Sequence, residues 1–389
     1  MNVFAYLRQE PCSPRRIRTP RIQDLYHASL VCRQWNNLAA HICYRQIQFY
    51  NVQSVFNFHQ LLQDSPHVRK MVKKLVFPAR LGRICPDELL DAFEGIINLV
   101  ESLHKLNITF RCVEEINYDE DISEFVHVIP MEEGRHGNLH DLTVYGPGAT
   151  LGRFPAGMTA HFVHLKILSL QGVFLSEPVL ADTTRPLPKL YSFTAFMGNA
   201  AIMMDDWLLS CPKLGHVAVT GRQRGGFPVG ADEPPMKVLV HGKLNYVCLS
   251  GLREKSMGRW LASCESVRAL GFGWDLFSVC DASMFHPDLY QVLVEISLKD
   301  EVSLDIFERS LGEDPSYDHL TVTLWQRNKS FEHIEGALKQ LCAELEVTLV
   351  IDDRSRYREH DELPSSSSRG QVFTDGLSEE LQTWEMAKT

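Results

Sequence analysis

The chain has 389 residues, with 49 Asp and Glu against 39 Lys and Arg, and a formal net charge of −10. Apolar residues make up 44% and charged residues 23%, which excludes a wholly disordered chain. The acidic balance argues against a nucleic-acid or membrane-surface partner, and the sequence has no apolar run long enough to span a membrane. Without a signal-peptide pattern, we expect a cytoplasmic and/or nuclear protein.

The first 21 residues predict a disordered lead, because Pro11, Pro14 and Pro20 oppose a helix. Residues 22–60 then predict a short helical segment. Its apolar positions have the spacing of one helical face: Leu25, Ala28, Leu30, Val31, Trp35, Leu38 and Ile42. On spacing alone, Trp35 is as well explained by a buried core position as by an exposed binding position.

Strand and helix patterns alternate after this segment. YRQIQFY and KKLVFP predict short strands, and residues 87–103 predict an amphipathic helix with Asp87 as its N-cap. A second helix is predicted over residues 330–345, with Ser330 as its N-cap, and DDWLLSCPKL and SMGRWLASCESV predict short helices.

Seven segments repeat one strand pattern, in which an apolar residue is followed by two further apolar anchors at positions +3 and +5. The anchors are Leu103/Leu106/Ile108, Leu139/Leu142/Val144, Leu165/Leu168/Leu170, Leu190/Phe193/Ala195, Leu214/Val217/Val219, Leu244/Val247/Leu249 and Val267/Leu270/Phe272. Their first anchors are 36, 26, 25, 24, 30 and 23 residues apart. Less regular strands follow in VLVEISL, HLTVTLW and LEVTLVI.

One strand and one helical return per repeat predict an α/β solenoid, because such a unit buries its apolar face only against its neighbours. Residues 61–352 resemble a degenerate leucine-rich-repeat solenoid. An ordinary α/β domain with a parallel sheet predicts the same alternation and stays open. In the solenoid register, Ser169, Thr194, Ala218, Cys248 and Ala269 lie near the concave surface. Residues 353–389, with four serines at 365–368, predict a disordered tail.

The N-terminal segment also resembles part of an F-box. That family carries a run close to D-L-L-x-x-S-L-V-C-R-x-W-x-x-L-A, and ten residues here match it: Asp24, Leu25, Ser29, Leu30, Val31, Cys32, Arg33, Trp35, Leu38 and Ala39. The phrase LLQDSPHVRKMVKKLVF, residues 61–77, resembles the continuation in fungal members, many of which carry leucine-rich-like repeats. The family's first helix, with its Leu-Pro-x-Glu-Ile-Leu motif, has no counterpart before Asp24. The box is therefore predicted to be truncated or incompletely encoded.

The resemblance implies a substrate-recognition subunit of a cullin–RING ubiquitin ligase. Its box would dock on a Skp-family adaptor and so on the cullin scaffold, while the repeats would bind an unknown target protein. Residues that fit adaptor binding, or the core that supports it, are Leu25, Leu30, Val31, Cys32 and Trp35. No catalytic or metal-ligating motif is present, so we expect neither enzyme activity nor a cofactor. A repeat-based protein-interaction scaffold with no ligase link remains the alternative.

Overall fold

The computed structural model describes slightly more than half of the chain. The described residues are 27, 30–49, 52–77, 87–109, 126–127, 138–146, 150–151, 162–175, 185–196, 200–220, 236–250, 261, 267–280, 285, 289–296, 302–312, 320–326 and 334–353. The predicted lead, residues 1–21, and all of the predicted tail except Asp353 lie outside them. The chain divides into two compact units, one ending at Leu190 and the other beginning at Tyr191.

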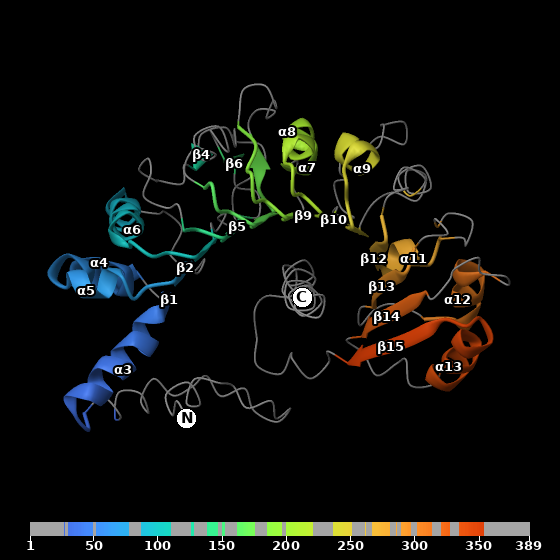
Figure 1. The fold of residues 1–389 in the computed structure, drawn as a ribbon, viewed down its shortest axis with the longest axis horizontal. Coiled ribbons are helices and arrows are strands. Elements are labelled where there is room, and N and C mark those ends of the chain that lie inside the picture. Colours follow the sequence, from blue (N-terminus) through green and yellow to red (C-terminus); the bar gives the residue numbers. More distant parts are fainter. Residues whose placement is uncertain are drawn as a thin grey trace, which may run out of the picture. The chain divides into compact units, whose positions relative to one another are not determined.

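The first unit alternates helices with short strands (Figure 1). Its helices are α3 (Arg33–Arg45), α4 (Val52–Asp64), α5 (Pro66–Arg69) and α6 (Asp87–Leu99). Its main strands are β1 (Gln46–Gln48), β2 (Lys74–Phe77), β3 (Lys105–Thr109), β5 (Asp141–Tyr145) and β7 (Ile167–Gln171). Three two-residue strands, β4 (Val126–His127), β6 (Thr150–Leu151) and β8 (Phe174–Leu175), form a separate parallel sheet.

The main strands of the first unit pair in parallel in the order β1-β2-β3-β5-β7. The second anchor of each repeat falls in one register row, so that Leu106 lies beside Leu142 and Leu142 beside Leu168. These three side chains are at most 1% exposed. The register predicted from the sequence is therefore confirmed in this unit.

The second unit repeats the plan with seven parallel strands. They are β9 (Ser192–Phe196), β10 (His216–Thr220), β11 (Tyr246–Ser250), β12 (Ala269–Gly273), β13 (Gln291–Ile296), β14 (Thr321–Gln326) and β15 (Thr348–Asp353). The helices are α7 (Ala200–Met203), α8 (Asp205–Ser210), α9 (Lys237–His241), α11 (Trp274–Phe277), α12 (Leu304–Leu311) and α13 (Glu335–Glu344). In Figure 1 these helices lie on one side of the strands.

Anchor alignment also holds in the second unit. Phe193, Val217, Val247 and Leu270 share one register row, which continues through Val292 and Val322. The strands alternate, so these residues face the helices while their neighbours in sequence face the other way. Each unit is thus an α/β layer of parallel strands with helical returns, an arrangement compatible with a solenoid-like repeat.

The helix predictions hold with shifted ends. Helix α6 begins at the predicted Asp87 but ends at Leu99, and α8 covers most of the predicted DDWLLSCPKL helix. Helix α13 begins at Glu335, so the prediction of Ser330 as its N-cap is wrong, and Ser330 itself lies outside the described residues. Of the predicted SMGRWLASCESV helix, only Leu261 and Val267 are described, and Leu261 is helical.

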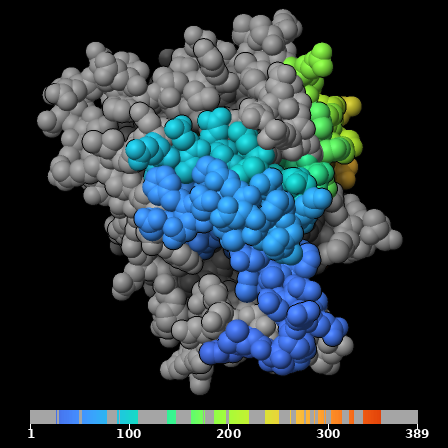
Figure 2. Space-filling model, turned by 90° about the vertical axis from the view of Figure 1, so that its left-hand side faces the viewer, coloured from blue at the N-terminus to red at the C-terminus, as the bar shows by residue number. Residues whose placement is uncertain are grey.

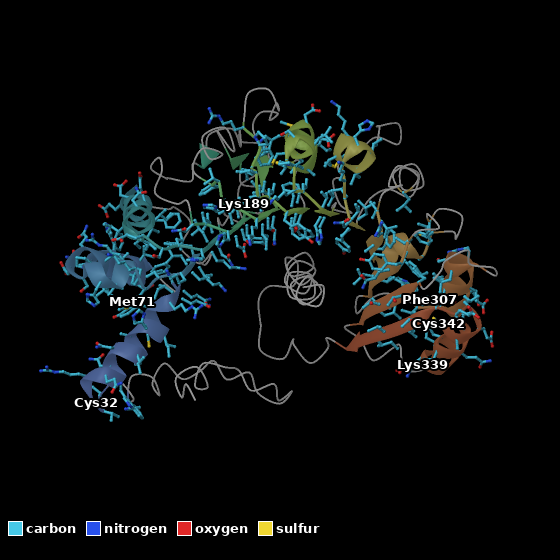
Figure 3. All side chains as sticks on the ribbon, in the orientation of Figure 1. Cys32, Met71, Lys189, Phe307, Lys339 and Cys342 are labelled. Atoms are coloured by element: carbon cyan, nitrogen blue, oxygen red, sulfur yellow. The ribbon has the colours of Figure 1, made fainter. Side chains whose placement is uncertain are left out.

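Aromatic side chains fill the helix side of the second unit. The Phe307 ring of α12 is fully buried, with its centroid 5.4 Å from the Trp274 and Phe277 rings of α11 (Phe307 is labelled in Figure 3). The neighbouring repeats that carry α11 and α12 therefore share one aromatic core.

We expect Phe307→Ala to lower the free energy of unfolding by about 3–5 kcal/mol, because it leaves a cavity between two repeats. Urea denaturation followed by circular dichroism measures the loss. Val350→Ala is the control, because this apolar side chain of β15 is 43% exposed, and its loss is expected to stay within about 0.5 kcal/mol. Equal losses in the two variants would contradict the shared core.

Candidate binding surfaces

The N-terminal helix α3 leaves apolar side chains in solvent. Leu30 is 66% exposed and Val31 63%, in the turn before the helix, while Trp35 is 39% and Leu38 43% exposed on the helix itself. We call these four residues the head patch. Figure 2 shows the end of the unit where α3, in deep blue, extends from the lighter blue α4 and α5. Large apolar side chains gathered on one exposed element are typical of an interaction surface.

The local sequence explains why this helix is exposed yet held in place. No Gly or Pro interrupts Arg33–Arg45, and Arg45 in the last turn favours the negative end of the helix dipole. Ala39 is the one side chain that α3 buries, and the helix runs directly into β1. The amide of Phe49, just after β1, donates to the carbonyl of Val76 in β2. The helix is thus fixed at its C-terminal end, while the head patch lies in the turn before it and in its N-terminal half.

The sequence-predicted docking residues divide into two groups. Leu30, Val31, Cys32 and Trp35 are all exposed, and Figure 3 places Cys32 at the outer end of α3. Leu25 lies outside the described residues. Exposure argues against the core interpretation for Leu30 and Val31, which contribute little to packing within the chain.

The strand face opposite the helices is polar in the first unit. Nζ of Lys105 lies 2.6 Å from a carboxylate oxygen of Asp141 on the neighbouring strand, and the two side chains are 32% and 15% exposed. Further along, the amide of Gln171 donates to the Ser169 hydroxyl at 3.1 Å. The Lys105–Asp141 pair stays partly exposed and can meet a polar partner, whereas Ser169 and Gln171 are only 3% and 1% exposed.

A row of histidines follows the start of the strands in this unit. The His104 and His140 ring centroids are 5.4 Å apart, and the His140 and His164 centroids 6.4 Å. Nζ of Lys189 donates to Nδ1 of His164 at 2.6 Å. Partial burial, followed by the charges of His104, Lys166 and the other cations nearby, lowers the pKa of His140. His140 therefore gains its positive charge at a lower pH than an ordinary histidine does.

In the second unit the same strand face is apolar and closed. The sequence placed Thr194, Ala218, Cys248 and Ala269 on this face, and Ser169 on the matching face of the first unit. The structure puts all five there. Their exposed fractions are only 1–7%, so they do not form an open concave surface as they stand.

Three further residues of this face were missed by the sequence analysis: His216, Tyr246 and Leu293. His216 lies between Tyr191, with ring centroids 4.2 Å apart, and Tyr246, at 5.8 Å. Tyr246 and Leu293 complete a buried cluster with Ala218, Cys248 and Ala269. Each could have been found from the alternation, because His216 and Tyr246 directly precede a helix-facing anchor and Leu293 directly follows one.

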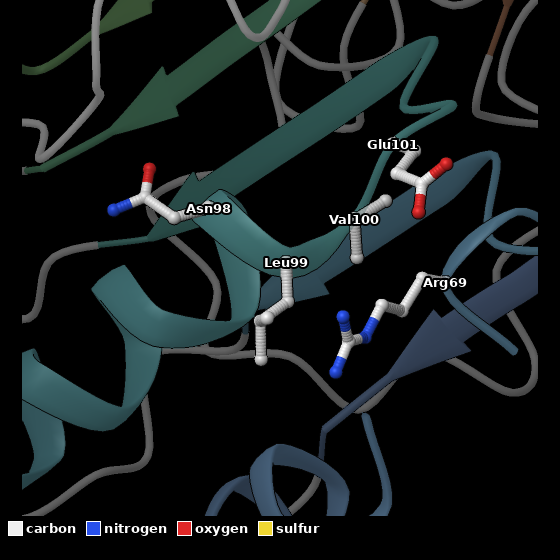
Figure 4. Close-up of a pocket in the computed structure, with 5 residues that line it drawn as sticks. All are labelled: Arg69, Asn98, Leu99, Val100 and Glu101. Atoms are coloured by element: carbon white, nitrogen blue, oxygen red, sulfur yellow. The ribbon is translucent and has the colours of Figure 1, made fainter. Parts of the chain in front are cut away.

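A shallow hollow lies between α5 and the end of α6. It is lined by Arg69, Asn98, Leu99, Val100 and Glu101 (Figure 4). Nε of Arg69 donates to the Leu62 carbonyl at 2.7 Å, and a terminal nitrogen donates to the Gln63 carbonyl at 3.2 Å. These carbonyls belong to the last turn of α4, which lacks donors from its own helix. Arg69 therefore caps a helix, and its guanidinium is engaged in structure rather than offered to a ligand.

The described part of the chain contains no group of three His, Cys, Asp or Glu side chains placed to hold a metal ion. Within the same residues, no helix combines the length and apolar character needed to cross a membrane. The surfaces with a chemical character of their own in these residues are thus the head patch and the two strand faces.

Burial of His216 predicts a pH dependence of stability. Burial lowers the pKa of His216 to about 4, whereas the unfolded chain binds this proton near pH 6.5. Between these values the unfolded state carries a proton that the folded state does not. The resulting stability is fully present above pH 6.5 and is lost as the pH falls towards 4, by up to roughly 3 kcal/mol.

We expect His216→Gln to reduce the loss of stability between pH 6.5 and pH 4, as measured by urea denaturation at each pH. His241→Gln, at an exposed histidine of α9, is the matched control and should retain the wild-type profile. If His216→Gln and wild type lose stability in parallel over this range, His216 is not buried in its neutral form.

Comparison with known proteins adds no family assignment: no protein-family model matches the chain, and a search of curated proteins finds no significant match.

Proposed function

We propose that the protein is a target-binding subunit of a cullin–RING ubiquitin ligase that acts in the cytoplasm or nucleus. Residues 22–60 act as an F-box-like head that docks on a Skp-family adaptor. Residues 61–352 form a leucine-rich-repeat-like solenoid that binds a target protein. The adaptor and cullin scaffold bring the target to the catalytic subunit, so this chain needs no catalytic residues of its own.

The exposure of the head patch is the observation that carries the proposal. Leu30 and Val31 are nearly two-thirds exposed, and both lie within the run that resembles the second half of an F-box. Full burial of one such apolar side chain by a partner contributes a favourable free energy of about 1.5–3 kcal/mol relative to its exposure to water. A partner with a complementary apolar groove would recover this free energy.

The register of the repeats supports the solenoid half of the proposal. Parallel pairs join consecutive repeats within each unit, and the apolar anchors face the helices. In a solenoid, the opposite strand face is the usual binding surface, because it does not pack against the helices. Here that face carries the Lys105–Asp141 pair in one unit and the His216–Tyr246 cluster in the other.

One observation favours the alternative, a repeat scaffold with no ligase link. Strand β1 pairs with β2 through Ile47 and Leu75, so the head segment also closes the sheet of the first unit. A segment that only capped the sheet would serve a scaffold equally well. Capping does not explain why Leu30 and Val31 face solvent, however, and for this reason we prefer the ligase subunit.

Purified Skp-family adaptor tests the proposal directly. We expect the full chain to bind it, and Leu30→Ser combined with Trp35→Ala to weaken binding at least tenfold, because buried apolar anchors dominate such interfaces. Isothermal titration calorimetry measures the affinity. Since both side chains are exposed, the substitutions should leave the unfolding midpoint nearly unchanged.

Gln34→Ser combined with Asn36→Ser is the matched control, because these exposed polar residues belong to the same helix and should leave the affinity unchanged. If the adaptor fails to bind the wild-type chain, the ligase assignment is refuted, and the repeat-based scaffold is the remaining proposal. Equal weakening by both pairs would show that the head patch is not the docking surface.

A further inference from the structure

A basic residue precedes each of the five main strands of the first unit, β1, β2, β3, β5 and β7. Backbone hydrogen bonds join these residues into a ladder, in which the amide of each donates to the carbonyl of the one before it at 2.8–2.9 Å. The members of the ladder are Arg45, Lys73, His104, His140 and Lys166. We call these five residues the basic edge. Because the ladder holds their backbones side by side, the five residues form one row at the amino ends of the strands.

The second unit has the same kind of ladder without the charge. Five successive members are Tyr191, Gly215, Asn245, Arg268 and Tyr290, of which only Arg268 is basic. The backbone hydrogen bonds therefore do not require basic side chains. A row of like charges is unfavourable by itself, because neighbouring cations repel one another. The strand geometry thus leaves the basic edge of the first unit unexplained, and a bound anion would explain it.

The cations of the basic edge are not matched by carboxylates in the described part of the chain. Arg45 and Lys166 are exposed and Lys73 is partly exposed. Among the described residues, none of these three side chains forms an ion pair. Their charges are therefore available to a partner.

One carboxylate, that of Asp141, directly follows the edge residue His140, and both of its oxygens are engaged. One lies 2.6 Å from Nζ of Lys105, and the other accepts a hydrogen bond from the Thr143 hydroxyl at 3.5 Å. Burial is the largest cause that lowers the pKa of His140. The charged groups that lower it further are all basic: His104, Lys166, His164 and Lys189. The surroundings of His140 thus carry an excess of positive charge.

His164 and Lys189 add two donors beside the basic edge. The His164 ring lies 6.4 Å from that of His140, measured between centroids, and its Nδ1 accepts a hydrogen bond from Nζ of Lys189 (labelled in Figure 3). Because the ammonium group only donates, the neutral His164 ring carries its proton on Nε2. His164 can therefore donate a hydrogen bond to an anion without gaining a charge.

The length of the basic edge fits a short extended peptide. Neighbouring strands lie about 4.8 Å apart, so five strands in a row span about 19 Å. An extended peptide rises about 3.3 Å per residue, so about six residues cover this length, with every second side chain on one side. The net charge of −10 disfavours a long polyanion such as a nucleic acid, because the rest of the chain would repel it.

We propose that the basic edge, with His164 and Lys189, binds an acidic segment of a partner protein. The segment lies extended across the starts of the five strands and places Asp or Glu carboxylates against the cations. This site borders the strand face of the first unit. The inference rests on protein binding by the repeats, which both candidate functions share, and it requires neither the adaptor nor the head patch.

A fluorescein-labelled peptide of alternating Glu and Ser residues tests the inference on the full chain by fluorescence anisotropy. We expect saturable binding at low salt and its loss in about 0.5 M NaCl, because the charges are then screened within a few ångströms. The same peptide with Gln in place of Glu should not bind. Arg45→Gln combined with Lys166→Gln should raise the dissociation constant about fivefold or more. Since both side chains are exposed, the unfolding midpoint should stay nearly unchanged.

Lys213→Gln combined with Lys243→Gln is the matched control, because it removes the same charge from two exposed lysines of the second unit and should leave the dissociation constant nearly unchanged. Absence of saturable binding to the wild-type chain would overturn the inference. Equal weakening by both pairs would also overturn it, because net charge alone would then account for binding. If oligouridine RNA binds more tightly than the Glu–Ser peptide and the Arg45/Lys166 variant loses that affinity, the edge is a nucleic-acid site instead. The adaptor titration is a separate measurement, so failure here leaves the ligase assignment standing.

Discussion

Parallel pairing holds the apolar anchors of successive repeats in one register, and the rest of each unit depends on this alignment. Leu106, Leu142 and Leu168 lie side by side and are at most 1% exposed. A slip of one residue would turn Lys105 and Asp141 towards the helices, since strand side chains alternate between faces. Burying those charges costs far more than the anchors gain. The register of the strands thus also determines which side chains face the helices and which lie on the opposite strand face.

Because the apolar anchors occupy the strand face that packs against the helices, the residues of the opposite strand face can differ between the two units. In the first unit the strand face holds the Lys105–Asp141 pair and remains partly exposed, whereas in the second unit it is closed over Cys248 and Tyr246. The head patch lies on a separate element, α3, which is anchored through Ala39 and β1. The head patch and the strand faces can therefore change independently, as the proposed recruiting subunit would require.

The strands and their anchors were predictable because alternation is a local property of the sequence. All seven repeated segments form strands, which pair in the expected register within each unit, and Cys248 is buried as its apolar setting indicated. The start of α13 was misplaced because Ser330 is a good cap by residue type alone. Local pattern could not decide whether Trp35 is buried, nor that side chains on the strand face beside Cys248 are buried as well, because burial depends on contacts between residues distant in the sequence.

The proposed function depends on the head segment coupling a repeat array to an adaptor. Hydrogen–deuterium exchange of the full chain, with and without purified Skp-family adaptor, tests it most directly. We expect amides in the segment from Leu30 to Ala40 to exchange more slowly in the complex, while those of the strands exchange at unchanged rates. Slower exchange confined to the strands, or no change anywhere at saturating adaptor, would contradict it.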